Sequence, residues 1–320
     1  MNKKGNRTVA AVIVTYNRKK LLLKNLEACL KQKYKINSII IVDNHSTDNT
    51  KEYIYNNLYD TDIIDYIYMD ENLGGSGGFS FGTKYAYEKG YDYIWLMDDD
   101  GKPSNEYTLQ NLMIYVSNNN IYNEPLMINS LVCSNDDDLS FGIFYKDTIV
   151  YKRKEIKEIF VKNTCNPFNG TLLSQKLIEL IGVPVSDYFI KGDEKEYLYR
   201  ALKYKAYIGT VTDSVYNHPS PRKNMEQKNF CGKLVTNNIE AGWKEYYNMR
   251  NTCLNNKLYS SHPYIKNLRF YLGRIIKVFM FSREKIKLIK MITIGIIHAN
   301  KKIKGRYYLP GDKIYKYDTK

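Results

Sequence analysis

The first half of the chain alternates between short apolar runs and amphipathic segments. Apolar runs of strand length occupy residues 8–14, 38–42, 63–68 and 91–97. Between them, residues 19–31 place leucines at helical spacing on one face. Such alternation, with strands that are apolar throughout, is typical of a parallel sheet covered on both faces by helices. The pattern therefore predicts a doubly wound, Rossmann-like α/β fold.

The second half is less regular. Strands are expected at residues 127–133, 141–151, 206–209 and 211–216. A helix is expected to begin at the acidic run 193–196, because carboxylates in a first turn interact favourably with the helix dipole. From about residue 233 the pattern becomes helical. We therefore expect a mixed-sheet domain over residues 1–230 and a helical region over residues 231–320.

Polar residues follow the apolar strands where the strands end. Thr15, Tyr16, Asn17 and Arg18 come after the first strand, and Asp43 comes after the second. The carboxyl ends of parallel strands share one edge of the sheet, where open α/β folds bind ligands. These side chains are therefore expected to line a binding site.

Three consecutive carboxylates, Asp98, Asp99 and Asp100, come directly after the fourth strand. Their mutual repulsion requires a compensating cation, and a hard divalent metal ion prefers such oxygen ligands. A second aspartate triplet, residues 136–138, has no clean strand before it. We expect a functional site at the first triplet and a solvated turn at the second.

A glycine-dense stretch, residues 71–79, lies between the third strand and the following helix. We expect a loop in which Gly74 and Gly75 allow the backbone to approach a phosphate or a sugar without intervening side chains. Asn72 belongs to this loop, and Ser76 is expected to add a hydrogen bond.

The positive charge is concentrated near the end of the chain. The net charge is +14, and residues 264–306 alone carry +11, because they hold twelve Lys and Arg against one acidic residue. Large apolar side chains are interspersed with these cations, as in helices that lie on an anionic membrane surface. A helical appendage packed on the rest of the protein is the alternative. Nucleic-acid binding is disfavoured, because no nucleic-acid module accompanies the charge.

The cysteines and the N-terminus indicate a cytoplasmic protein. The five cysteines are scattered, without a disulfide or zinc spacing, which favours a reducing compartment. Residues 1–8 are polar and basic and do not resemble a signal peptide, and no apolar run is long enough to span a bilayer. We expect a cytoplasmic protein that is peripheral on the inner face of the membrane if the basic region binds lipid. The oligomeric state is not predicted.

Taken together and in this order, the motifs resemble family 2 glycosyltransferases of the GT-A fold. The resemblance covers about residues 8–220 and rests on the strand-end residues, the glycine stretch, the first triplet, the acidic helix start and His218. The glycine stretch and the triplet are most similar to those of galactofuranosyltransferases, with rhamnosyltransferases as near relatives. The resemblance implies an inverting, Mn²⁺- or Mg²⁺-dependent transferase that uses UDP-galactofuranose or, second, dTDP-rhamnose. The implied acceptor is a growing surface glycan, on a lipid carrier.

The resemblance also assigns roles to residues. Donor binding falls to Thr15, Tyr16, Asn17, Arg18, Asp43, Asn72, Gly74, Gly75, Ser76, Asp98 and Asp99. Metal binding falls to Asp98, Asp100 and His218. Asp43 would accept a hydrogen bond from a pyrimidine N–H, although capping of the next helix is an alternative for it.

An inverting transferase needs a base that deprotonates the acceptor hydroxyl. The family places it second in an acidic pair, which here is Asp193-Glu194. The usual aspartate is thus replaced by Glu194, so Asp193 stays open as the base. Glu196 and Arg200 follow, and they are spaced so that they could merely brace the helix as an ion pair.

Two other functions are consistent with parts of the pattern. A nucleotidyltransferase also needs a glycine loop and metal-binding acids, but its phosphate loop normally follows the first strand, whereas here the glycines follow the third. A glycan-binding protein on a degenerate transferase fold would not need an intact triplet, His218 and Glu194. Metal-dependent hydrolysis of a donor would separate this last alternative from an enzyme.

Overall fold

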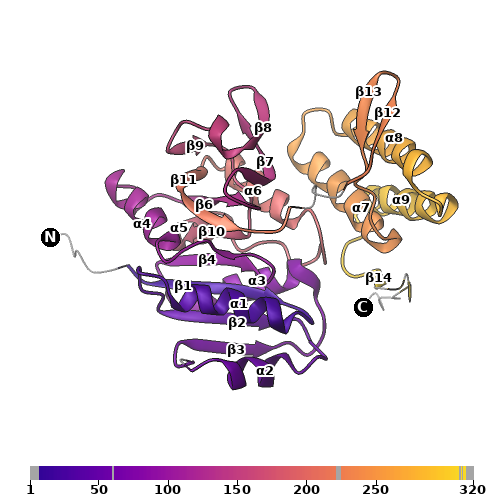
Figure 1. The fold of residues 1–320 in the computed structure, drawn as a ribbon. Helices are drawn as coiled ribbons and strands as arrows, with labels where there is room; N and C mark the ends of the chain where they lie inside the picture. Colours follow the sequence, from indigo (N-terminus) through magenta and orange to yellow (C-terminus); the bar gives the residue numbers. More distant parts are fainter. Residues whose placement is uncertain (1–6, 60, 221–224, 310, 312, 315–320) are drawn as a thin grey trace. The chain divides into compact units, whose positions relative to one another are not determined.

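The strands of the chain join mainly in one mixed sheet, which has 11 strands in the described part of the protein (Figure 1). The computed structural model describes residues 7–59, 61–220, 225–309, 311 and 313–314. Four parallel strands form one half of the sheet in the order β3-β2-β1-β4. Their bounds are β1 Val9–Thr15, β2 Ser38–Asp43, β3 Ile64–Tyr68 and β4 Tyr93–Asp98.

The other half of the sheet begins with a reversal of strand direction. β10 (Asn169–Ser174) is antiparallel both to β4 and to β6 (Leu126–Cys133). β11 (Tyr207–Asn217) is parallel to β6. The remaining members are β5 (Lys102–Pro103) and β9 (Phe160–Lys162) beside β11, and β7 (Asp138–Tyr145) and β8 (Thr148–Lys152) beyond β6. The expected mixed α/β sheet is confirmed.

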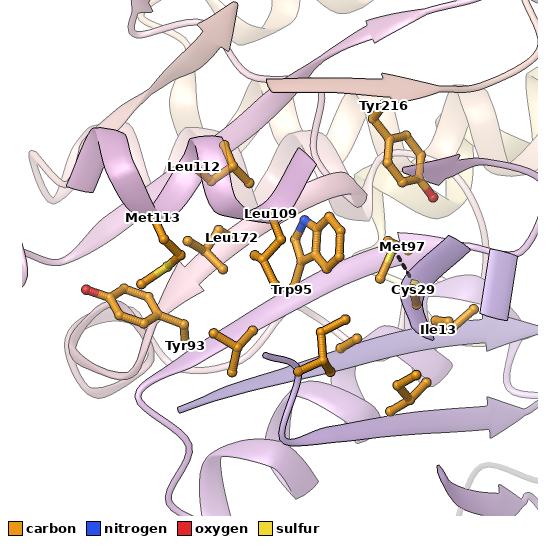
Figure 2. Close-up of a cluster of buried hydrophobic side chains, with 14 of the residues drawn as sticks. Ile13, Cys29, Tyr93, Trp95, Met97, Leu109, Leu112, Met113, Leu172 and Tyr216 are labelled. Atoms are coloured by element: carbon orange, nitrogen blue, oxygen red, sulfur yellow. Dashed lines mark hydrogen bonds between the residues drawn. The ribbon is translucent and has the colours of Figure 1, made fainter. Parts of the chain in front are cut away.

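The core of the sheet is apolar because β1, β2 and β4 carry apolar side chains on both faces. Every residue of β1 and β2 is buried. Trp95 and Met97 of β4 pack with Leu109 and Leu112 in the largest buried cluster, which Figure 2 shows. The helices are α1 (Lys19–Leu30), α2 (Thr50–Asn57), α3 (Gly74–Glu88), α4 (Thr108–Asn118), α5 (Gln175–Ile181) and α6 (Asp193–Lys203), with a 3₁₀ turn at Arg153–Glu155.

The C-terminal part contributes three long helices and two small hairpins. The helices are α7 (Gly242–Tyr259), α8 (Pro263–Phe281) and α9 (Lys285–Asn300). The hairpins are β12 (Gln227–Phe230) with β13 (Lys233–Thr236), and β14 (Tyr308–Leu309) with β15 (Lys313–Ile314). Met249, Cys253, Val278 and Ile292 form the centre of their apolar cluster. Among these helices Arg274 pairs with Glu245, and both side chains are almost fully buried.

The chain divides into two compact units. The first, here called the sheet unit, comprises Met1–Asn72, Gly78–Pro184 and Arg200–Ser220, and the second, the helical unit, comprises Leu73–Gly77, Val185–Tyr199 and Pro221–Lys320. Residues 1–6, 60, 221–224, 310, 312 and 315–320 lie outside the described residues. The expected functional division at residue 230 stays a prediction.

Four local predictions were wrong. The segment 141–151 is not one edge strand but belongs to the β7–β8 hairpin, which turns at Lys146 and Asp147. The two short strands expected at 206–216 are the single strand β11, whose pairing with β6 shifts register between Val211 and Val215. Residues 233–236 form a strand, so the helical region begins only at α7. Gly74, Gly75 and Ser76 lie in the first turn of α3 rather than in a loop.

All five cysteines are free, and only Cys231, between β12 and β13, is exposed. Burial raises the pKa of the other four thiols, which makes them poor nucleophiles. Over the described ranges, no helix combines the length and the apolar character needed to cross a bilayer.

Candidate active site

The register of the parallel strands brings their polar ends to one edge of the sheet. Thr15 at the end of β1 lies opposite Asp43 at the end of β2. On the other side of β1, Val14 lies opposite Asp98 at the end of β4. Three neighbouring strands of the sheet, β2, β1 and β4, therefore end in polar side chains at the same edge, as the sequence predicted.

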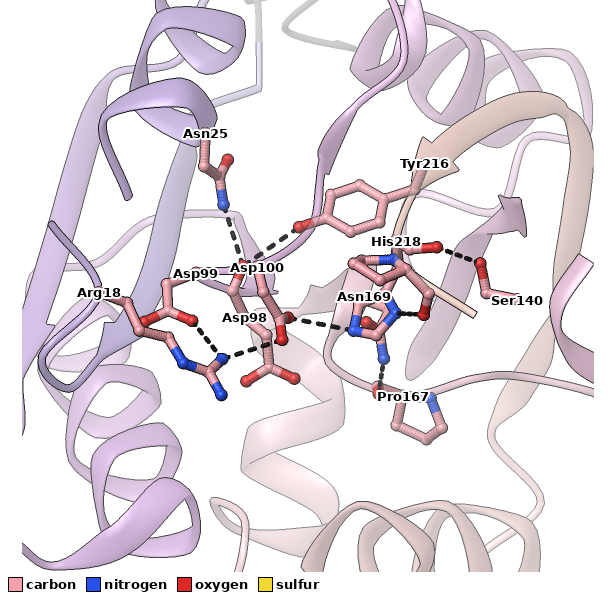
Figure 3. Close-up of polar contacts among 11 residues, drawn as sticks. Arg18, Asn25, Asp98, Asp99, Asp100, Ser140, Pro167, Asn169, Tyr216 and His218 are labelled. Atoms are coloured by element: carbon pink, nitrogen blue, oxygen red, sulfur yellow. Dashed lines mark hydrogen bonds and ion pairs between the residues drawn. The ribbon is translucent and has the colours of Figure 1, made fainter. Parts of the chain in front are cut away.

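The backbone of the first triplet is fixed by side chains from other elements. The carbonyl of Asp98 accepts hydrogen bonds from Asn25 Nδ2 at 3.0 Å and from the Tyr216 hydroxyl at 3.4 Å (Figure 3). The Asp98 N–H donates to the Phe168 carbonyl at 3.1 Å. Asn25 and Tyr216 were not predicted. Asn25 could have been identified, because it is a polar residue on the apolar face of α1, between Leu22 and Leu26.

Arg18 neutralises part of the negative charge of the triplet. Its Nη1 lies 3.0 Å from Asp99 Oδ1 and 2.9 Å from Asp100 Oδ2. The Thr15 hydroxyl donates to Asp99 Oδ2 at 2.8 Å. The last residue of β1, Thr15, thus provides a hydrogen-bond donor to the triplet, and Arg18 just after the strand provides a cation. The Tyr16 side chain is exposed.

His218 reaches the triplet because β5 and β11 are antiparallel. Lys102 lies opposite Asn217, the last residue of β11, so His218, which follows β11, comes beside the end of the triplet. His218 Nε2 lies 3.1 Å from Asp100 Oδ1. Its Nδ1 lies 2.7 Å from the Pro219 carbonyl oxygen, which can only accept a hydrogen bond. Nδ1 therefore carries the hydrogen, and Nε2 is directed at Asp100 (Figure 3).

The charges of the triplet are unequally compensated. Burial, together with the charges of Asp100 and Asp99, raises the pKa of Asp98 to about 8. Burial also raises the pKa of Asp99, although Arg18 and Thr15 oppose this effect. The pKa of Asp100 is lowered, because His218 and Arg18 outweigh its burial. The ion pair with Asp100 likewise outweighs burial at His218 and raises the pKa of that imidazole.

The donor set fits a divalent cation, although the side chains now contact one another directly. No group of three His, Cys, Asp or Glu side chains is spaced to enclose a metal ion within the described residues. Asp100 Oδ1 and His218 Nε2 are 3.1 Å apart. This distance matches the separation of about 3 Å between two ligand atoms at adjacent positions around an octahedral ion. The Asp98 carboxylate makes no hydrogen bond in the described part of the chain, and burial together with the charges of Asp100 and Asp99 raises its pKa although Arg18 and His218 oppose the effect. A bound cation would offset this remaining cost of the ionised carboxylate.

The loops that follow β1 and β2 are joined by their own side chains. The Asn17 side-chain oxygen accepts the Thr47 N–H at 2.7 Å, and the Asn17 N–H donates to Ser46 Oγ at 2.9 Å. Asp43 is buried and accepts the Ser46 N–H at 2.8 Å and the Tyr66 hydroxyl. The helix-capping alternative for Asp43 does not hold, because Asn49 occupies the N-cap position of α2. Its role toward a pyrimidine stays a prediction.

The remaining candidate residues, apart from Asn72 in the sheet unit, belong to the helical unit. Gly74 begins α3 with a φ of +71°, and a Cβ at this position would lie 2.0 Å from the Phe189 carbonyl oxygen. Ser76 is fully buried and its hydroxyl donates to the Val185 carbonyl at 2.5 Å, so this hydrogen is used within the protein. Glu194 Oε2 accepts the Gly192 N–H at 2.8 Å.

The second triplet differs from the first in exposure. Asp136 and Asp137 are exposed, and Asp138 forms an ion pair with Lys152 on the surface. This arrangement matches the solvated turn that was expected.

Comparisons with known proteins agree with this architecture. The family model described as "Glycosyl transferase family 2" matches residues 10–177, just over half of the chain. The galactofuranosyltransferase GlfT1 of Mycolicibacterium smegmatis is 27% identical over 252 residues, which are 76% of this chain and 81% of that protein. The dTDP-rhamnosyl transferase RfbF of Shigella flexneri is 26% identical over 313 residues, 94% of this chain and 98% of its own.

A solved structure has the same fold. It is the mannosyltransferase PcManGT of Pyrobaculum calidifontis in complex with GDP-Man and Mn²⁺, at 13% identity and a TM-score of 0.53. The match covers 93% of this chain and 76% of that one.

Proposed function

The chain belongs to glycosyl transferase family 2, and on that premise we propose that it moves galactofuranose from UDP-galactofuranose to a hydroxyl of a growing, lipid-linked glycan. The observation that carries the proposal is the set Arg18, Asp98–Asp100 and His218 at the carboxyl edge of the sheet. Similarity to GlfT1 over 76% of the chain supports this choice of donor. The alternative donor, dTDP-rhamnose, is favoured by the match to RfbF, which extends over 94% of the chain.

Different residues at the carboxyl edge of the sheet bind different parts of the donor. Asp43 and the joined loops after β1 and β2 recognise the nucleotide base, and Arg18 holds the triplet in place. Asp98, Asp100 and His218 would hold Mn²⁺ or Mg²⁺, and such an ion would supply Lewis-acid neutralisation of the diphosphate. Glu194 then takes the proton of the acceptor hydroxyl, with Asp193 as the alternative base. Inversion of the anomeric carbon follows from attack on the face opposite the leaving diphosphate.

The first test is calorimetric titration of UDP, and separately of dTDP, into the protein with Mn²⁺ and again with EDTA. We expect metal-dependent binding of UDP that is lost in Asp100→Ala. Asp136→Ala is the matched control, because it removes an exposed aspartate from the other triplet. Tighter binding of dTDP would reassign the donor to dTDP-rhamnose. Absence of binding by either nucleotide would refute the proposal.

The second test concerns the chemical step. Mn²⁺-dependent release of UDP from UDP-galactofuranose in water should fall by at least 10²-fold in Glu194→Gln, while UDP binding stays unchanged. A larger loss in Asp193→Asn than in Glu194→Gln would move the base to Asp193. A wild-type protein that binds the donor but never cleaves it would support the glycan-binding alternative.

We also propose that α8 places the enzyme on an anionic membrane surface. One face of α8 exposes large apolar side chains spaced three or four residues apart: Ile265, Leu268, Leu272, Ile276 and Phe279. The opposite face is buried in the helical unit. Exposed cations lie on the same helix, at Lys266 and Arg269, and shortly after its end, at Arg283 and Lys285. Burial of apolar side chains next to cations that contact anionic headgroups stabilises such a helix at the interface.

Sedimentation with vesicles tests this placement. The protein should bind vesicles that contain 30% phosphatidylglycerol and not pure phosphatidylcholine vesicles, and Leu272→Glu should weaken binding by at least tenfold. Ile114→Glu in α4 is the control, since Ile114 is a similarly exposed apolar residue. A second copy of the chain is a poorer occupant of this face, because two regions of +11 would repel. Concentration-dependent self-association that Leu272→Glu abolishes, without vesicle binding, would overturn the assignment.

A further inference from the structure

The turn that precedes α6 has an unusual backbone. In residues 188–192, here called the strained turn, Phe189, Lys191 and Gly192 have φ values of +65°, +62° and +88°. For residues with a side chain, this left-handed conformation costs about 1–2 kcal/mol each. Such a backbone persists only where surrounding contacts hold it, so the neighbouring contacts of this turn are informative.

Asn251 of α7 holds the strained turn from one side. Its Nδ2 lies within hydrogen-bond distance of three successive acceptors, the carbonyls of Tyr188 at 3.0 Å, Ile190 at 2.9 Å and Lys191 at 2.7 Å. Asn251 is fully buried. Its side-chain oxygen accepts Arg250 Nε at 2.8 Å, which fixes the orientation of the amide. One side chain therefore lies within hydrogen-bond distance of three of the five carbonyls of the turn.

The strained turn in turn fixes the carboxylate of Glu194. The Gly192 carbonyl accepts Asn255 Nδ2 at 2.8 Å, and the Gly192 N–H donates to Glu194 Oε2 at 2.8 Å. Gly192 is thus held on its carbonyl side by α7 and holds the carboxylate on its N–H side. A rotation of this residue would move the Glu194 carboxylate directly.

The other side of the turn contacts the glycine-rich start of α3. The Phe189 carbonyl accepts the Ser76 N–H at 3.0 Å. Gly74 packs so closely on the same carbonyl that no side chain fits between them. The strained turn therefore joins the predicted donor-side glycines to the predicted base within the helical unit.

We propose that Asn251 is a positioning residue for catalysis, which sets the Glu194 carboxylate by holding the strained turn. This role rests on the proposed function, in which Glu194 is the base. Asn251 is fully buried, and among the described residues its side-chain hydrogen bonds go to backbone carbonyls of the turn and to Arg250, so its effect is exerted through the turn.

The test compares two variants of α7. Asn251→Asp keeps the shape of the side chain but removes both amide hydrogens. Asn256→Ala is the matched control, because among the described residues the Asn256 side chain donates to Asn267 on α8 and not to a carbonyl of the turn. Asn255→Ala removes the hydrogen bonds to the Gly192 carbonyl and from the Tyr188 hydroxyl, and it serves if Asn251→Asp does not fold.

Three readouts separate positioning from a general loss of structure. Mn²⁺-dependent release of UDP from UDP-galactofuranose should fall about 10–100-fold in Asn251→Asp, as expected for a displaced reacting group. The Kd for UDP with Mn²⁺ should change less than twofold. Hydrogen exchange at the amides of Gly192 and Ser76 should become faster in Asn251→Asp and stay unchanged in Asn256→Ala.

The outcomes distinguish this inference from the proposed function. If wild-type protein releases no UDP but the amides still lose protection in Asn251→Asp, the turn is held by Asn251 and the donor assignment fails instead. Unchanged exchange at Gly192, or turnover within twofold of wild type, would overturn the inference. If the rate of UDP release falls equally in Asn251→Asp and Asn256→Ala, Asn251 has only a structural role in α7.

Discussion

Replacing Asp98 with asparagine should stabilise the metal-free protein at neutral pH while it abolishes metal-dependent nucleotide binding. In the absence of a cation, the Asp98 carboxylate lies among two other carboxylates and receives no hydrogen bond from the described residues. Its ionised form is therefore costly in the folded protein and not in the unfolded chain. Asparagine removes the charge and keeps the shape.

The size of the effect follows from the pKa of Asp98, which rises from 3.8 to about 8 on folding. Because the folded state retains a proton that the unfolded chain has lost, stability falls as the pH rises between these values. At about 1.36 kcal/mol per pH unit, the cost at pH 7 is about 4 kcal/mol. The new asparagine amide is buried without a hydrogen-bond partner, which lowers the free energy of unfolding by about 1–2 kcal/mol. A net gain of about 2–3 kcal/mol corresponds to roughly 5 °C in Tm.

The assay is thermal unfolding of both proteins in EDTA from pH 5 to pH 9. The Tm difference should be small at pH 5 and grow until about pH 8. Asp136→Asn makes the same chemical change at an exposed position and should leave Tm unchanged at every pH. Saturating Mn²⁺ should raise the Tm of the wild type and not that of Asp98→Asn. A variant that is no more stable than the wild type at pH 8 would refute the electrostatic reasoning.

Three further predictions concern single side chains. The pKa of His218 is raised on folding, so its ion pair stabilises the protein below the unfolded pKa of about 6.5, and this stabilisation is lost as the pH rises through the folded pKa. His218→Gln should therefore lower Tm at pH 6 in EDTA, and the Tm difference should shrink as the pH is raised. Gly74→Ala should cost at least about 2 kcal/mol in urea unfolding, because the new methyl group meets a backbone oxygen at a positive φ; Gly75→Ala, with no atom within 4 Å, should be neutral or mildly stabilising. Glu245→Gln leaves the buried Arg274 without a counter-charge and should cost about 3–5 kcal/mol by the same measurement, whereas a cost below 1 kcal/mol would show that the pair contributes little.

The sequence was most informative where one local pattern decides the structure. The runs that became β1, β2 and β4 are apolar at every position, so their polar ends had to reach a common edge. The contact between Asp100 and His218, 118 positions apart, was expected only through resemblance to a family. In the structure it arises from the pairing of β5, a strand of two residues that no periodicity could indicate.

Other features depend on tertiary contacts that leave no local signal. Nothing in the residue types of Phe189 and Lys191 favours a left-handed backbone, which is imposed by Asn251 from sixty residues further along the chain. The register shift in β11 likewise reflects its partner β6 and not its own alternation. The glycine stretch misled for a different reason, since glycine lowers helix propensity and yet the packing around α3 overrides that preference.

The distribution of the cysteines makes the unmodified protein convenient to label. Cys231 is the one exposed thiol, and the other four combine burial with raised pKa values that suppress the thiolate. A maleimide dye should therefore react at a single position without any mutagenesis. The hairpin that carries Cys231 contacts the end of α8, since Lys228 Nζ donates to the Met280 carbonyl at 2.8 Å. An environment-sensitive fluorophore at this thiol would report directly on whether α8 meets lipid.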